Sequence, residues 1–88
     1  MTMLFSLGCL YVTPGIRELI KQGVNIQSFL TRHLRGDWGD ICQEDKSANN
    51  HAAERDGMIL SAYWVTPDTK IWIMTDSGST TIMLPDEY

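Results

Sequence analysis

Four carboxylates lie close together near the middle of the chain and are its densest cluster of chemically versatile groups. They are Asp37, Asp40, Glu44 and Asp45. If Asp40 begins a helix, Glu44 follows one turn later, and two carboxylates on one helix face can bind a divalent ion or divide acid and base roles. Acids in a first helical turn also interact favourably with the helix dipole. The cluster predicts helix capping, a metal site that includes His51, or an acidic face for a partner.

The other residues with catalytic potential form no recognisable motif. The chain contains two histidines and two cysteines, His33, His51, Cys9 and Cys42, and their spacing matches no metal-ligand or nucleophile signature. His33 falls on the apolar stripe of a predicted helix, which is typical of a core-edge residue with one hydrogen bond. The sequence therefore indicates no catalytic residue, no metal and no cofactor, and it favours a non-enzymatic role.

Aromatic side chains offer a second kind of surface. Tyr63 and Trp64 are neighbours in a predicted strand and must point to opposite faces of the sheet. Trp72, in the following strand, is placed to pair with one of them. Exposed rings of this kind can stack on nucleic-acid bases, but such sites also need a basic groove, and buried rings are core residues. Trp38, in a glycine-flanked turn, predicts either a core plug or a partner contact.

Length and charge narrow the classes of function. The 88 residues make one small domain, 1–88. Eleven acidic and seven basic residues give a net charge of −4, which argues against a general nucleic-acid binder and against polybasic membrane attachment. No apolar run approaches the roughly 20 residues that span a bilayer. Without a signal-peptide pattern, the chain is expected in the cytoplasm, with its cysteines as buried free thiols.

Periodicity and turn residues predict seven elements. We expect strands over 4–12, 58–65, 70–75 and 79–84, and helices over 14–22, 26–34 and 41–54, the second capped by Asn25 and the third by Asp40. The order strand–helix–helix–helix–strand–strand–strand predicts an α+β fold, in which an antiparallel meander carries the helices on one face. The last strand is expected at an edge of the sheet, so a homodimer through that strand stays an open question.

Five short motifs are spread over most of the chain. They are Gly36-Asp37-Trp38-Gly39-Asp40, Glu44-Asp45, Leu60-Ser61-Ala62-Tyr63, Lys70-x-Trp72-Ile73-x-Thr75 and Leu84-Pro85-x-Glu87-Tyr88. In these motifs the chain resembles a family of small uncharacterised accessory proteins carried by bacterial plasmids, phages and integrative elements. The resemblance implies that the protein is carried by a bacterial mobile genetic element, and it implies no catalytic residues.

Three functions are weighed on these grounds. The first is an accessory protein of a mobile genetic element that binds an unidentified protein, with a host defence or restriction system as one target, through Trp38, Asp37, Asp40, Glu44 and Asp45. The second is a small metal-dependent hydrolase or nuclease that uses the acidic cluster. The third is a nucleic-acid-binding module that uses Tyr63, Trp64 and Trp72. The small size, the acidic charge and the lack of catalytic motifs favour the first.

Overall fold

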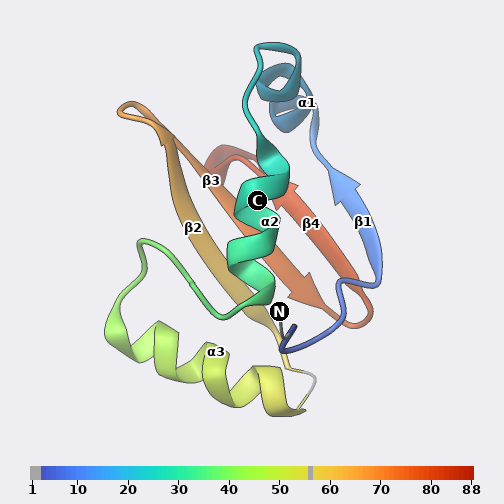
Figure 1. Ribbon diagram of the computed structural model, residues 1–88, viewed down its shortest axis with the longest axis vertical. Helices are drawn as coiled ribbons and strands as arrows, with labels where there is room; N and C mark the ends of the chain where they lie inside the picture. Colours follow the sequence, from blue (N-terminus) through green and yellow to red (C-terminus); the bar gives the residue numbers. More distant parts are fainter. Residues whose placement is uncertain (1–2, 56) are drawn as a thin grey trace.

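The computed structural model describes residues 3–55 and 57–88, and it has the α+β fold expected from the sequence (Figure 1). The elements are β1 (Cys9–Val12), α1 (Pro14–Lys21), α2 (Ile26–Leu34), α3 (Gln43–Arg55), β2 (Ile59–Thr66), β3 (Thr69–Asp76), β4 (Ser79–Met83) and the 3₁₀ turn η1 (Pro85–Glu87). This order of strands and helices confirms the prediction. The first strand is shorter than expected, because Gly8 adopts the left-handed conformation and interrupts the extended run before Cys9.

The four strands form one mixed sheet in the order β1-β4-β3-β2. Strands β2, β3 and β4 are the predicted antiparallel meander. The meander is not the whole sheet, because β1 pairs in parallel with β4, with Cys9 opposite Ser79 and Val12 opposite Ile82. The connection from β1 to β4 runs through the three helices and then β2 and β3, which is long enough for a parallel pair. The expectation that the last strand lies at an edge is therefore wrong, because β4 is an interior strand and the two edges are β1 and β2.

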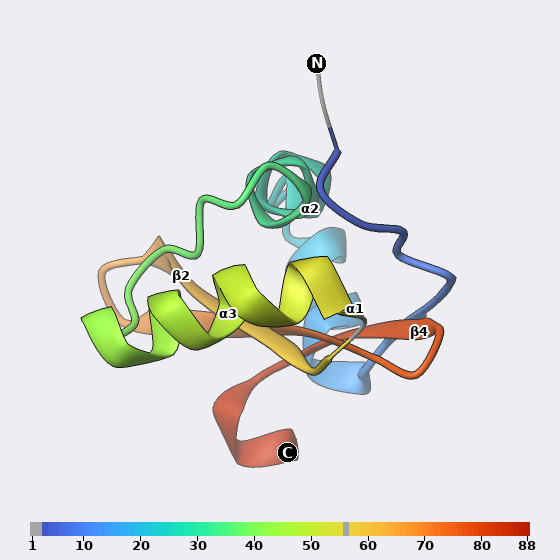
Figure 2. The same cartoon turned by 90° about the horizontal axis from the view of Figure 1, so that it is seen from below.

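The helices are distributed differently from the predicted layer on one face. Helix α2 crosses one face of the sheet, whereas the C-terminal turn η1 lies on the opposite side (Figure 2). The core between the sheet and the first two helices contains seven buried side chains, Ile16, Leu19, Ile26, Tyr63, Ile71, Ile73 and Ile82. Helix α3 runs along the outer edge of β2, which explains why its apolar stripe is so thin.

The outer edge of β2 is covered by side-chain and backbone groups. The Asn49 carboxamide accepts a hydrogen bond from Leu60 N–H at 3.1 Å and donates one to the Leu60 carbonyl at 2.7 Å. The Ala62 N–H donates to the Trp38 carbonyl at 3.1 Å, and the Asp40 N–H donates to the Ala62 carbonyl at 2.7 Å. These bonds satisfy the outward main-chain groups of Leu60 and Ala62, which an edge strand otherwise presents to other chains.

Of the two helix caps predicted from the sequence, the Asn25 cap is confirmed and the Asp40 cap is wrong. Asn25 caps α2 by accepting a hydrogen bond from Ser28 N–H. Thr13 precedes Pro14 at the start of α1, but its hydroxyl donates to Glu87, whose carboxylate also accepts from Gly15 N–H at 3.0 Å. Helix α3 begins only at Gln43, so Asp40 is not its cap.

Truncating the centre of the core tests this packing. Ile73 is 0% exposed, so we expect Ile73→Ala to lower the free energy of unfolding by about 2–5 kcal/mol. Leu30 on α2 is only half-buried, and Leu30→Ala should cost less. Urea denaturation measures both values. A loss below about 1 kcal/mol for Ile73→Ala is smaller than buried isoleucine truncations give and contradicts the core described here.

Candidate interaction surface

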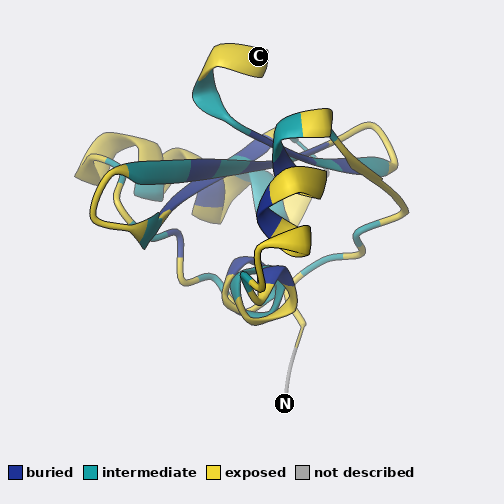
Figure 3. Cartoon of the chain, turned by 90° about the horizontal axis from the view of Figure 1, so that it is seen from above, coloured by how far each residue is buried: buried dark blue, intermediate teal, exposed yellow. Residues whose placement is uncertain are grey.

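The face of the sheet opposite α2 is largely uncovered. Strand register places one set of side chains on this face, namely Tyr11, Leu60, Ala62, Trp64, Lys70, Trp72, Met74, Thr81 and Met83. Of the described segments, the C-terminal turn is the one that lies over it, with Tyr88 packed edge-on against Trp72 at 5.8 Å between ring centroids (Figures 2 and 3). We call the surface beside this turn, formed by Tyr11, Leu60, Trp64, Trp72 and Met74, the open face. Tyr11 and Trp64 are exposed, and the other three are half-buried.

Trp64 is the most prominent side chain of the open face and is 53% exposed. Its indole N–H donates to the Asp40 carboxylate at 2.9 Å. The Lys70 ammonium contacts the same carboxylate oxygen at 3.1 Å and lies 5.2 Å from the centre of the Trp64 ring. An exposed tryptophan whose orientation is already held loses little side-chain entropy on binding, which is the property of an interface anchor.

Asp40 therefore has a different role from the predicted helix cap. Its hydrogen bond with Lys70, and then that with the Trp64 indole, hold the pKa of the Asp40 carboxyl below its ordinary value. The ionised carboxylate fixes both Trp64 and Lys70 at the rim of the open face. Sequence reasoning identified Asp40 as a site candidate but could not foresee partners 24 and 30 residues away.

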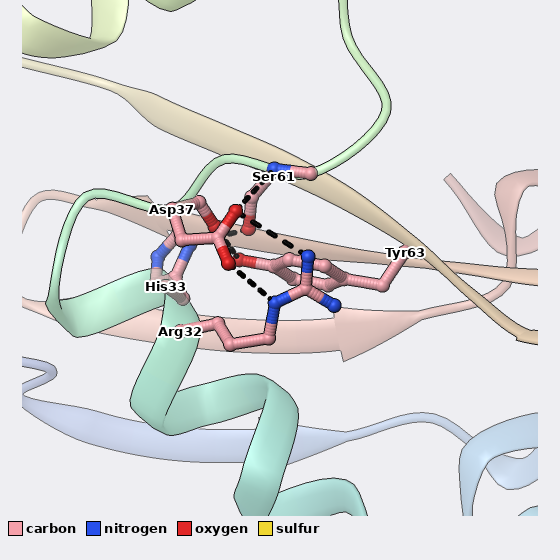
Figure 4. Close-up of polar contacts among 6 residues, drawn as sticks. Arg32, His33, Asp37, Ser61 and Tyr63 are labelled. Carbon is pink, nitrogen blue, oxygen red and sulfur yellow. Dashed lines mark hydrogen bonds and ion pairs between the residues drawn. The ribbon is translucent and has the colours of Figure 1, made fainter.

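A second polar arrangement flanks Trp64. Arg32 Nε lies 2.6 Å from the Asp37 carboxylate, and the guanidinium stacks 4.7 Å from the centre of the Tyr63 ring (Figure 4). The Tyr63 hydroxyl donates to the Asp37 carbonyl at 2.7 Å. The hydrogen bond from Arg32 lowers the pKa of the Asp37 carboxyl. A hollow of about 490 Å³ lies between this ion pair and Trp64, next to Asp40.

Trp38 does not contribute to this surface. It is 3% exposed, its indole N–H donates to the Asn50 side chain at 3.0 Å, and its ring stacks on Phe5. The sequence left a core plug and a partner contact as alternatives, and the structure shows the plug. Trp38 as a partner-binding residue is therefore a wrong prediction.

The remaining acidic candidates do not converge with Asp37 and Asp40 on one site. Glu44 and Asp45 lie exposed in the first turn of α3, where they complement the helix dipole. Within residues 3–55 and 57–88, no group of three or more His, Cys, Asp or Glu side chains is placed to hold a metal ion. The geometry that the hydrolase alternative requires of Asp37, Asp40 and Glu44 is thus not found in the described part of the chain.

The three aromatic candidates are divided between the two faces of the sheet, as the strand pattern predicted for Tyr63 and Trp64. Tyr63 faces α2 and is 1% exposed, so its ring cannot stack on a base. Trp64 and Trp72 share the open face as diagonal neighbours on β2 and β3. Leu60, Met74 and Tyr11 complete that face, and the sequence could not single them out, because it does not say which face the helices leave uncovered.

A buried hydrogen-bond chain extends from His33, which is 0% exposed rather than at the core edge. His33 Nδ1 lies 2.5 Å from Ser61 Oγ and Nε2 lies 2.9 Å from Thr75 Oγ1. Thr75 Oγ1 is 2.7 Å from Thr80 Oγ1, and the Thr80 hydroxyl donates to the Leu7 carbonyl at 2.8 Å. Reading back from that carbonyl, Thr80 and then Thr75 must each donate toward it, which places a proton on His33 Nε2. Because burial lowers the pKa of His33, Nδ1 carries no proton at neutral pH and accepts from the Ser61 hydroxyl.

This chain resembles a serine–histidine pair but is structural. Ser61 is also 0% exposed, so a substrate has no access to its hydroxyl. Burial lowers the pKa of His33 to about 4, which keeps the imidazole neutral at physiological pH. The sequence did contain a signal for this buried chain. Ser61, Thr75 and Thr80 each occupy an inward position of their strand, among positions that are otherwise apolar.

Two cysteines are free, as expected, but Cys9 and Cys42 are exposed rather than buried. None of the helices in the described part of the chain is long and apolar enough to cross a membrane. No protein-family model, curated protein or solved structure matches the chain.

Proposed function

We propose that this protein is a non-enzymatic interaction module that binds another protein through the open face. The observation that carries the proposal is the exposed and pre-oriented Trp64 on a sheet face that the described chain leaves largely uncovered. Contiguous aromatic and methionine-containing patches of this kind are typical of protein-binding surfaces. The preferred partner surface is apolar, with a polar rim that meets Asp40 and Lys70.

The charges of the open face favour a protein over a nucleic acid. Lys70 is the one basic residue that strand register places on this face, and it is paired with Asp40. Nucleic-acid affinity comes largely from basic side chains that neutralise phosphates. A face with one neutralised lysine on a chain of net charge −4 offers little of that interaction.

The setting of the proposal comes from the family resemblance alone. In that setting the protein acts in the bacterial cytoplasm as an accessory protein of a mobile element, against a host defence or restriction protein. One form of this action is inhibition of a defence nuclease by carboxylates that imitate DNA phosphates. It is the weaker form, because Asp37 and Asp40 are paired with Arg32 and Lys70.

Truncating Trp64 tests the proposal. The tagged protein is used to capture a partner from a bacterial lysate treated with nuclease, and the purified pair is then measured by calorimetry. We expect Trp64→Ala to weaken binding by about 30-fold or more, the loss typical of a hot-spot residue. Ile20→Ala removes another exposed apolar side chain, 46% exposed on α1, and should leave the affinity unchanged.

The outcome also separates the alternatives. Equal binding by Trp64→Ala and the unmodified protein contradicts the open face as the binding site. Recovery that disappears on nuclease treatment or at moderate salt favours the nucleic-acid module instead.

A further inference from the structure

One edge of the sheet is covered by other parts of the chain, and the other edge is not. The outer edge of β2 is covered by Asn49 and by the backbone of Trp38 and Asp40. Strand β1, at the other margin, has no described segment outside it (Figure 1). Its Leu10, Tyr11 and Val12 are 48%, 56% and 37% exposed. Natural edge strands are protected by a charge, a proline, a bulge or a very short length. Strand β1 is short, at four residues, but it carries no charge, proline or bulge.

The free main-chain groups of β1 can be assigned from its pairing. Cys9 N–H donates to the Gly78 carbonyl and Thr13 N–H to the Ile82 carbonyl, both at 3.1 Å. Because main-chain groups alternate in direction along a strand, Leu10 and Val12 direct their N–H and C=O groups to the free edge. Leu10 and Val12, two positions apart, thus present unpaired main-chain donors and acceptors at this edge.

We propose that β1 is the interface of a homodimer, in which two copies pair their β1 strands antiparallel and join their sheets into one. The inference does not rest on the function proposed above, although Tyr11 belongs to both surfaces. A second copy suits this edge because Met3 to Ile16 contains no charged side chain, although the whole chain carries a net charge of −4. The strand can therefore meet itself without bringing like charges together, as a two-fold interface requires.

The local backbone selects one register. Gly8, with φ +63°, ends the extended run on one side, and Pro14, which has no N–H, limits it on the other. The register that uses both free residues pairs Leu10 with the second copy's Val12, and the reverse, through four hydrogen bonds. Tyr11 of one copy then lies opposite Tyr11 of the other in a non-hydrogen-bonded pair, where side chains are closest. Leu10 and Val12 become covered on the α2 side and the two Tyr11 rings on the other.

Sedimentation analysis over a range of concentrations tests the dimer on the full chain. We expect the mass to rise from 10.0 kDa toward twice that value with concentration. Tyr11→Glu places two carboxylates directly opposite each other and should keep the protein at the mass of one chain. Ile20→Glu introduces the same charge on α1 and should still dimerise. A single-chain mass for the unmodified protein at every concentration overturns the proposal.

Cross-linking tests the register. In a background of Cys9→Ser and Cys42→Ser, Tyr11→Cys places two thiols at a pair whose Cβ atoms are about 4.5–5.5 Å apart, close enough for a disulfide after a small adjustment. Leu10→Cys places them two residues out of register, about 7–8 Å apart, and should cross-link far more slowly. Equal cross-linking by both variants, or none by Tyr11→Cys in a protein that dimerises, overturns the proposed interface. Neither measurement needs a partner, so failure here is distinguishable from failure of the open-face function.

Discussion

Trp38→Ala should destabilise the protein more than any other single aromatic truncation outside the sheet. Trp38 is 3% exposed and its ring packs against both Phe5 and His33, with centroid distances of 6.2 and 5.9 Å. Removal of a buried tryptophan costs about 3–5 kcal/mol, because the transfer energy is lost and a cavity remains. For a domain of this size that is a large part of the total stability. The free energy of unfolding, measured by urea denaturation with circular dichroism, gives the value.

Two variants serve as controls for this result. Trp38→Phe keeps an aromatic ring and loses the hydrogen bond to Asn50, so it should cost clearly less than Trp38→Ala. Trp64→Ala removes the same type of side chain from an exposed position and should have a small effect on stability. A larger loss for Trp64→Ala than for Trp38→Ala would show that the two rings have been given the wrong roles.

Acid should destabilise the fold through His33 before the carboxylates are protonated. The pKa of His33 is about 4 in the fold and 6.5 without the fold's influence, because burial penalises the charged imidazole. The unfolded chain therefore binds more protons between these values, and stability falls as the pH drops through this window. The loss is about 2 kcal/mol at pH 5 and about 3 kcal/mol at pH 4, relative to pH 7.5. Above about pH 7.5 the imidazole is neutral in both states and the effect vanishes.

Unfolding free energies between pH 7.5 and pH 4.5 test this assignment. His33→Gln removes the titrating group, and its stability should be nearly flat over the window even if its absolute stability is lower. Asp37, Asp40 and Glu87, whose pKa values are lowered in the fold, lose their contributions only at more acidic pH. An equally steep dependence in His33→Gln would assign the effect to another group.

The motifs that carry the family resemblance consist largely of residues that hold the fold together. Gly39 lies against the Ala62 carbonyl with φ +75°, where a side chain would collide with it. Ser61 and Thr75 belong to the His33 hydrogen-bond chain, and Glu87 binds the start of α1. A resemblance based on such positions describes the architecture and indicates no binding site, and the setting that it implies stays a prediction.

Residues with strong local signals were placed correctly. Asn25 caps α2, and the turns at Pro67 and at Ser77-Gly78 divide the apolar C-terminal half into three strands of the meander. The wrong cap shows the limit of the same reasoning. The pattern of Asp40 followed by Gln43 resembles a capping box, yet the Asp40 carboxylate binds Trp64 and Lys70, which come from strands far along the chain.

The sequence by itself determined the type and order of the elements, because periodicity, caps and turn residues act over a few neighbouring positions. Only the tertiary structure decided that β1 pairs with β4 at the edge of the sheet and that Trp38 is buried while Trp64 is exposed. It also decided which face and which edge of the sheet stay free. These outcomes depend on contacts between residues up to 74 positions apart, such as Thr13 with Glu87. No local pattern encodes which distant residue of the chain such a residue contacts. The proposed binding surfaces depend on those intramolecular contacts.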